Sequence, residues 1–110
     1  MVVGVLRKHT GRGPTKSRAH VCEDVVAVIL HNTLTRAERT LAANGSPEIV
    51  LASRRAFRDP MRPDLVAGVE RLTARTVIAC FSDNSIDPDM ALELFLLAPH
   101  ETAQPAGAGA

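Results

Sequence analysis

Three apolar segments of this 110-residue chain carry hydrophobic side chains on both faces of the strands that they are expected to form. In Val25–Leu30 both alternating sets of residues are apolar, and Thr76–Phe81 is similar. In Met90–Leu97, Glu93 is the one charged residue. A sheet that helices cover on one side normally shows polar residues on its open side. The pattern therefore predicts a sheet that needs cover on both faces.

Turn signals separate four strand-like segments. Strands are predicted at residues 17–23, 25–31, 76–82 and 90–97, because β-branched and apolar residues gather there between turn-forming residues. With two helical regions between the second and third strands, the order is ββααββ. This order is typical of an α+β fold with a four-stranded, mainly antiparallel sheet and helices on one face. A short helix ahead of the first strand, over the apolar N-terminus, is left open.

Capping signals place the two helical regions. Thr35 and Glu38 form a capping box for a helix over residues 36–44, and Gly45 can end it in a left-handed conformation. The second region starts at Ser46-Pro47 and runs to about residue 73. Two prolines interrupt it, so one kinked helix or two abutting helices are expected. The prolines are Pro60 and Pro63.

Composition argues against several classes of function. With three Phe and neither Tyr nor Trp, the chain is poorly suited to bind single-stranded nucleic acid by base stacking. The longest apolar run, Val25–Leu30, is far shorter than the ~20 residues of a membrane span. Basic residues follow the apolar N-terminus instead of preceding it, unlike a signal peptide. We expect a soluble cytoplasmic protein with one domain over residues 1–98 and a disordered tail over residues 99–110.

Cysteine and histidine spacing predicts neither a metal site nor a cofactor. Cys22 and Cys80 have no nearby CxxC or His partner, and both lie in predicted strands, so buried free thiols are expected. The four histidines show no ligand spacing either. Because no nucleophile can be paired with a base, we expect a protein that is not an enzyme.

The first candidate site is a loop rich in glycine and basic residues. Its backbone N–H groups, with Arg12 and Lys16, could hold an anion. It lacks the spacing of a P-loop and precedes a strand instead of a helix. The alternative is a rigid turn in which proline fixes the entry of the strand. The loop residues are Gly11, Arg12, Gly13, Pro14, Thr15 and Lys16.

A second candidate is the polar connection over residues 82–89. Its aspartates suggest a cation site, but the segment lacks the glycine and the closing glutamate of an EF-hand, so turns are favoured. The candidate residues are Ser82, Asp83, Asn84 and Asp87. Four arginines within two helical turns could also form a basic face, either solvated or binding phosphate or an acidic partner. These are Arg54, Arg55, Arg58 and Arg62.

Charge is distributed unevenly along the chain. Residues 1–20 contain five basic residues and no acid, whereas residues 76–110 contain five acids and neither Lys nor Arg. This asymmetry is compatible with an anion site near the N-terminus, with head-to-tail association, or with ordinary solvated surfaces. Because the predicted sheet is apolar on both faces, its second face must be covered either by the N-terminal helix or by another chain. We expect a homodimer or a protein partner.

Four segments, taken in order, resemble the MpsC family. They are the loop over residues 11–16 that leads into a strand, then residues 34–41, 69–73 and 82–89. The resemblance covers roughly residues 3 to 98. The family name refers to a Na+-translocating system that generates membrane potential. It implies an accessory or regulatory module of a membrane cation or inorganic-carbon uptake system, partnered by a membrane transport component, and it carries over no catalytic residue. The alternative is a small-molecule or anion sensor that uses the Gly11–Lys16 loop.

Overall fold

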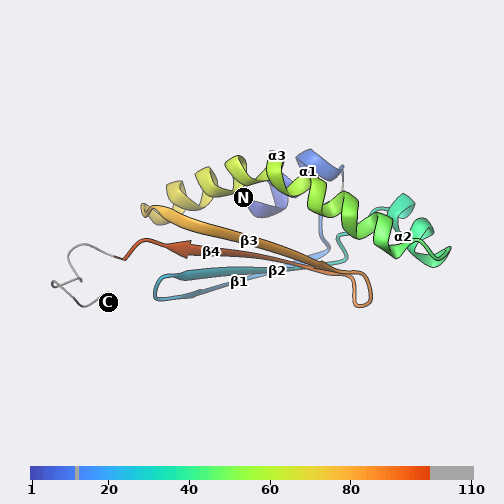
Figure 1. Cartoon of the computed structure of the whole chain (residues 1–110). Helices are drawn as coiled ribbons and strands as arrows, with labels where there is room; N and C mark the ends of the chain where they lie inside the picture. The colour runs from blue at the N-terminus through green and yellow to red at the C-terminus, as the bar shows by residue number, and fades with distance from the viewer. Residues whose placement is uncertain (12, 100–110) are drawn as a thin grey trace.

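Helices lie on one face of a four-stranded antiparallel sheet in the computed structural model, which describes residues 1–11 and 13–99 (Figure 1). The α+β class and the order ββααββ are confirmed, with one further helix ahead of the sheet. Residues 100–110 of the predicted disordered tail lie outside the described residues. The elements are α1 (Val2–Thr10), β1 (Lys16–Cys22), β2 (Val25–His31), α2 (Arg36–Ala43), α3 (Pro47–Thr73), β3 (Val77–Ser85) and β4 (Met90–Leu97).

The strands follow the order β1-β2-β4-β3, so β1 and β3 are the edges of the sheet. All three pairings are antiparallel. β1 and β2 are joined by a tight turn in which Glu23 adopts a positive φ of 51°. β3 carries an irregularity between Val77 and Ala79, next to its start. The rest of the register is continuous, so each row of side chains can be followed across the sheet.

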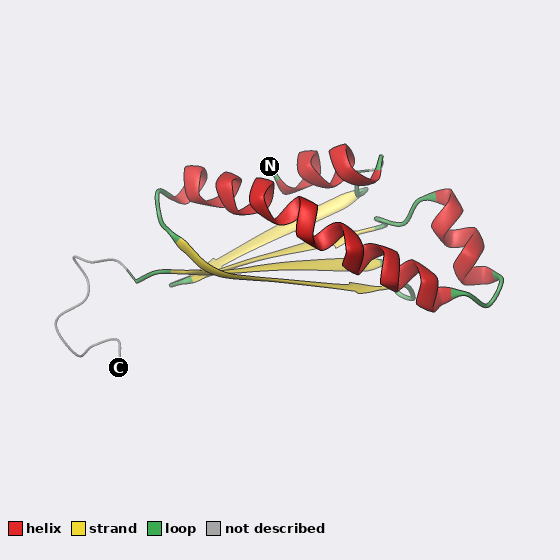
Figure 2. Cartoon of the chain, turned by 45° about the horizontal axis from the view of Figure 1, so that its top comes forward, coloured by secondary structure: helices red, strands yellow, loops and turns green. Residues whose placement is uncertain are grey.

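The core fills the space between the sheet and the layer formed by α1 and α3 (Figure 2). Phe95 of β4 and Leu30 of β2 are almost completely buried beneath Leu65 of α3. Val2 and Leu6 of α1 join the same cluster. Full burial of each such side chain stabilises the fold by about 1.5–3 kcal/mol. The packing therefore places α1 and α3 in one layer, on one side of the sheet.

Local sequence signals set the ends of α2 as predicted. The Thr35 Oγ1 atom accepts a hydrogen bond from the Glu38 backbone N–H at 3.2 Å, and the Glu38 Oε1 atom accepts one from the Thr35 N–H at 2.8 Å. Gly45 follows the helix with a φ of +83°, where a side chain would be strained. Pro47 then starts α3 in the position that proline tolerates best.

α3 is one helix of 27 residues that continues through Pro60 and Pro63. The structure thus selects the single helix over two abutting helices. Each proline leaves the carbonyl of the preceding turn without its helical N–H partner. Both prolines are exposed, so water can reach this part of the helix surface. Tertiary packing of Met61 and Leu65 on the sheet holds the helix together across the interruption.

The prediction that both thiols are buried is wrong for Cys22, which is exposed, whereas Cys80 is partly buried against the core. All seven residues of β1 are exposed, and β1 is an edge strand of the sheet. The expected polar connection is also shorter than predicted. β3 stays paired with β4 as far as Ser85, opposite Met90, so only residues 86–89 form the turn.

Candidate functional site

The Gly11–Lys16 loop begins as the C-terminal cap of α1. Gly11 has a φ of +79°, and its N–H donates to the Arg7 carbonyl oxygen at 2.9 Å. The carbonyl end of a helix is the negative pole of its dipole and favours cations, which agrees with the basic residues in the last turn. The start of the loop is therefore poorly placed to bind an anion. Arg12 lies outside the described residues.

The remainder of the loop is tied to the end of β2. The Thr15 N–H donates to the His31 carbonyl oxygen at 3.1 Å, and the Thr15 Oγ1 atom accepts from the Asn32 side chain at 2.7 Å. A side chain at Gly13 would have its Cβ 2.7 Å from the Arg7 guanidinium. Pro14 is half-buried, and Lys16 begins β1 as an exposed residue. These contacts fit the rigid-turn alternative better than an open anion site.

The structure does not bring the predicted polar residues together as one site. Ser82, Asp83 and Asn84 lie in β3 and alternate between the two faces of the sheet. Ser82 points to the helix layer, whereas Asp83 lies on the opposite face and accepts the Asn84 N–H at 2.9 Å. Asp87 is exposed in the turn, before a cis bond to Pro88. Treating residues 82–84 as part of a loop was wrong because the β3–β4 ladder continues past them.

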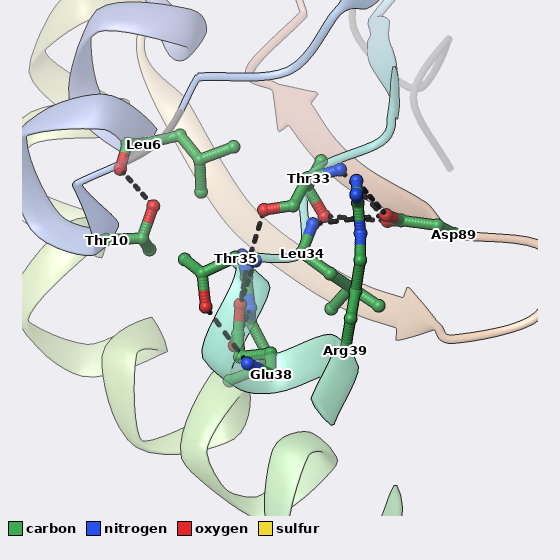
Figure 3. Close-up of polar contacts among 9 residues, drawn as sticks. Leu6, Thr10, Thr33, Leu34, Thr35, Glu38, Arg39 and Asp89 are labelled. Carbon is green, nitrogen blue, oxygen red and sulfur yellow. Dashed lines mark hydrogen bonds and ion pairs between the residues drawn. The ribbon is translucent and has the colours of Figure 1, made fainter. Parts of the chain in front are cut away.

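Asp89 fastens the β3–β4 turn to the segment that leads into α2 (Figure 3). Its Oδ1 atom accepts the Thr33 N–H at 2.9 Å, and its Oδ2 atom accepts the Leu34 N–H at 3.2 Å. The Arg39 guanidinium lies 3.8 Å from the same Oδ2 atom. Because both of its oxygens accept hydrogen bonds from backbone amides, this carboxylate has a structural role and links the turn to residues 33–34.

A second structural link, made by the hydrogen bonds of Arg54, joins α2 to α3. Arg54 is 5% exposed; its Nε donates to the Glu38 Oε2 atom at 2.7 Å and its Nη2 to the Thr33 carbonyl oxygen at 2.7 Å. Burial alone would raise the pKa of Glu38, but hydrogen bonds from Arg54 and Thr35 and the Arg54 charge outweigh it and lower that pKa below its ordinary value. Arg54 is therefore not part of a solvated basic face.

Glu93 is the buried acid of the helix-facing side of the sheet. It is 6% exposed on β4 and accepts a hydrogen bond from the Ser82 hydroxyl. Arg58 of α3 is half-buried near it, and the Arg58 Nε atom has no hydrogen-bond partner among the described residues. We call Ser82, Glu93 and Arg58 the Glu93 cluster. The cavity beside it has a volume of about 20 Å³. That volume can hold one water molecule but not a substrate.

Burial determines the ionisation of this cluster. It raises the pKa of Glu93 above its ordinary value, and the Ser82 hydrogen bond and the charges of Arg58 and Arg62 offset the rise only in part. Burial also raises the pKa of the Cys80 thiol, and the negative charge of Glu93 adds to this effect. A thiol with a raised pKa is a weak nucleophile at neutral pH, so the cluster lacks the features of a reactive cysteine site.

The face of the sheet that points away from the helices is apolar and uncovered by any described residue (Figure 1). We call it the open face. Phe81 is 55% exposed there and Leu92 is 37% exposed. The prediction of a sheet that is apolar on both sides is thus confirmed, and the option that the N-terminal helix covers the second side is wrong, because α1 packs in the other layer. The apolar members of the open face are Val25, Ala27, Ile29, Ala79, Phe81, Met90, Leu92, Leu94 and Leu96.

Charged residues lie at the two edges of the open face and differ in sign. Lys16, Arg18 and His20 of β1 point to this face, in register with His31, Ile29 and Ala27 of β2. On the other edge, Asp83 of β3 points the same way. A shallow depression of about 320 Å³ lies beside Asp83 and is lined mainly by β3 and β4 residues with Ile29. The face therefore has an apolar centre, a basic edge and an acidic edge.

Comparison with protein families gives a match that spans residues 2–99. The matching family is described as the Na+-translocating membrane potential-generating system (MpsC). This chain belongs to the MpsC family. The resemblance carried by its sequence motifs is thereby confirmed over nearly the whole chain. Neither the curated proteins nor the solved structures give a match.

No helix within residues 1–11 and 13–99 combines the length and the hydrophobicity that a bilayer crossing requires. The family name links the chain to a membrane potential-generating system, and the open face is an apolar surface that no described residue covers.

Several of these features could not be predicted from the sequence. Glu93 was visible only as the single charge in an apolar strand, which was the available signal for a buried acid. Arg54 and Arg58 could not be separated from the exposed Arg55, because helical spacing alone does not show which side of α3 meets the sheet. The partnership between Asp89 and residues 33–34 joins segments 55 residues apart, and no local pattern indicates it.

Proposed function

We propose that this chain is an accessory or regulatory module of a membrane Na+-translocating, membrane potential-generating system, and that it acts by binding other polypeptides. The family match supports the association with such a system. The observation that carries the mode of action is the open face of the sheet, where Leu92 of the inner strand β4 and Phe81 of the edge strand β3 are exposed. Contiguous apolar surface of this kind marks an interaction site in proteins that function in water.

The energetics favour a protein-binding role for this face. Removing apolar surface from water stabilises a complex by about 25 cal/mol per Å² before the costs of association. The strand backbone is already ordered in the sheet, so only side-chain entropy is lost when a partner packs on this face. The Glu93 cluster, by contrast, is closed by α3 and has room for one water, which supports a structural role for that carboxyl group.

The proposal is tested in membrane vesicles from cells that produce the complete Na+-translocating system. Removing this chain should reduce the Na+-dependent membrane potential, measured with a potential-sensitive dye, and adding back the wild-type chain should restore it. Leu94→Asp, in the middle of the open face, should fail to restore the potential.

Leu72→Asp is the matched control, because Leu72 is 72% exposed but lies on α3, away from the open face. It should restore the potential like the wild type. Vesicles that develop the same Na+-dependent potential with and without the chain would overturn the proposed role.

A further inference from the structure

We propose that a second copy of this chain covers the open face, with the two sheets packed face to face about a two-fold axis parallel to the strands. This inference goes beyond the association with a membrane system, because it names a partner that the chain itself supplies. It follows from the register of the sheet and from the signs of the charges at its edges.

The register places one residue of each strand in a single row across the open face. Arg18 of β1 lies opposite Ile29 of β2, Ile29 opposite Leu92 of β4, and Leu92 opposite Asp83 of β3. Directly paired residues in a sheet point to the same side. The row therefore starts with a cation at one edge, crosses two large apolar side chains and ends with an anion at the other edge.

A two-fold axis parallel to the strands lays β1 of each copy over β3 of the other and leaves the order of the rows unchanged. Arg18 then lies opposite Asp83 of the second copy, and the symmetry generates this pair twice. Stacked sheets are about 10 Å apart, a gap that a long arginine and an aspartate can bridge from opposite sides. An arginine can also enter the depression of about 320 Å³ that lies beside Asp83.

The apolar rows match under the same operation. Ile29 lies opposite Leu92 of the second copy, and the small Ala27 lies opposite the larger Leu94 of the second copy. Small residues facing large ones allow two layers to interdigitate without voids. Phe81 at the β3 edge meets His20 of β1, another planar ring. No charge is left facing a like charge.

Other ways of pairing two copies conflict with the observed charges. A two-fold axis perpendicular to the strands would place β1 on β1 and β3 on β3, which gathers Lys16 and Arg18 of both copies at one edge and both Asp83 carboxylates at the other. Edge-to-edge pairing through β1 would bring the same basic residues together, and basic side chains on an edge strand oppose such pairing. On the β3 edge, the irregularity at Val77–Ala79 and the exposed Asp83 have the same effect.

A charge swap tests the proposal on the purified full-length chain, measured by sedimentation equilibrium. The wild type should have twice the monomer mass of 11.8 kDa. Arg18→Glu and Asp83→Arg should each raise the dimer dissociation constant by about tenfold or more, because each places two like-charged pairs in the interface. The double variant restores opposite charges and should return the dissociation constant to within about threefold of the wild type.

Folding and specificity controls accompany this test. Arg18 and Asp83 are exposed in a single chain, so all variants should keep the wild-type circular dichroism spectrum. Arg55→Glu, on the exposed side of α3, should leave the dissociation constant unchanged.

A wild-type chain that is monomeric at about 100 μM, far above the concentrations at which stable dimers dissociate, would overturn the proposal. A double variant that associates no better than either single variant would overturn it as well. Because these measurements contain no membrane component, their failure would leave the proposed role in the Na+-translocating system standing, and loss of that role would leave a measured dimer intact.

Discussion

At the scale of single residues, the ionisation of Glu93 opposes folding, whereas the ionisation of Glu38 supports it. Glu93 is buried and Glu38 is half-buried, but of the two only Glu38 accepts hydrogen bonds from an arginine guanidinium. Burial therefore dominates at Glu93 and raises its pKa, whereas hydrogen bonds and charge prevail at Glu38 and lower its pKa. The two groups should respond to pH in opposite directions.

Glu93→Gln should stabilise the chain at pH 7. Glu93 binds its proton more tightly in the folded chain than in the unfolded chain, so the charged form costs stability above the folded pKa. The amide keeps an acceptor for the Ser82 hydroxyl and removes that cost. We expect a gain of about 1 kcal/mol, or roughly 4–8 °C in Tm for a domain of this size. Thermal unfolding followed by circular dichroism measures it.

The gain should shrink as the pH falls through the folded pKa of Glu93 and vanish below the ordinary value of 4.5, where both states of the wild type are protonated. Asp59→Asn, an exposed neutral substitution on α3, is the control and should leave Tm within about 2 °C. A Glu93→Gln chain that is less stable than the wild type at pH 7 would show that attraction to the charges of Arg58 and Arg62 outweighs the cost of burying the Glu93 carboxylate.

Arg54→Met should destabilise the chain by about 3–5 kcal/mol at pH 7, because it leaves the half-buried Glu38 carboxylate without its guanidinium and the Thr33 carbonyl without a donor. Arg55→Met, one position along on the exposed surface, should change stability by less than about 0.5 kcal/mol. Urea unfolding gives both values.

The cost of Arg54→Met should also depend on pH. Because the folded pKa of Glu38 lies below its ordinary value, the contribution of its charge is present above that value and is lost as the pH falls through the folded pKa. The difference between the wild type and Arg54→Met should therefore narrow in acid. Equal losses of stability for Arg54→Met and Arg55→Met would contradict the structural role of the Arg54–Glu38 hydrogen bonds.

At the scale of elements, α3 shows how packing can override a local break. Pro60 lacks the N–H that would close its helical turn, whereas Pro47 stands at the first position, where no helical partner is required. Pro60→Ala should therefore stabilise the chain by about 1 kcal/mol, and Pro47→Ala should leave stability unchanged or lower it by up to about 1 kcal/mol. Urea midpoints compare the two. Destabilisation by Pro60→Ala would mean that the helix needs this interruption to follow the sheet.

The elements that were predictable from the sequence are those with local signals. The capping box at Thr35 and Glu38 marked the start of α2, and turn residues bounded β2 and β4. The length of β3 was not predictable, since Asp83 and Asn84 have turn propensity and only pairing with β4 keeps them extended. Burial of Cys22 was likewise misjudged, because the place of β1 at the edge of the sheet depends on strand order. Contacts with residues that are distant in the sequence determine both the length of β3 and the exposure of Cys22.

At the scale of the whole molecule, the basic and the acidic segments of the sequence supply charged residues at opposite edges of one sheet. Arg18 in the basic N-terminal segment and Asp83 in the acidic C-terminal segment lie at opposite ends of one row. The apolar centre between them was foreseeable from alternation within β2 and β4. Their placement in one row was not, because it requires the register of all four strands. A face built in this way is suited to self-association about one axis.

The central claim, that another chain covers the open face, is tested most directly by methyl NMR with a soluble paramagnetic agent. In the purified chain at about 100 μM, above the expected dissociation constant, the methyl signals of Ile29, Leu92 and Leu94 should resist broadening. Those of Leu72, which is 72% exposed on α3, should broaden strongly. Equal broadening of Leu92 and Leu72 at this concentration would contradict the account, since it would leave the open face in contact with water.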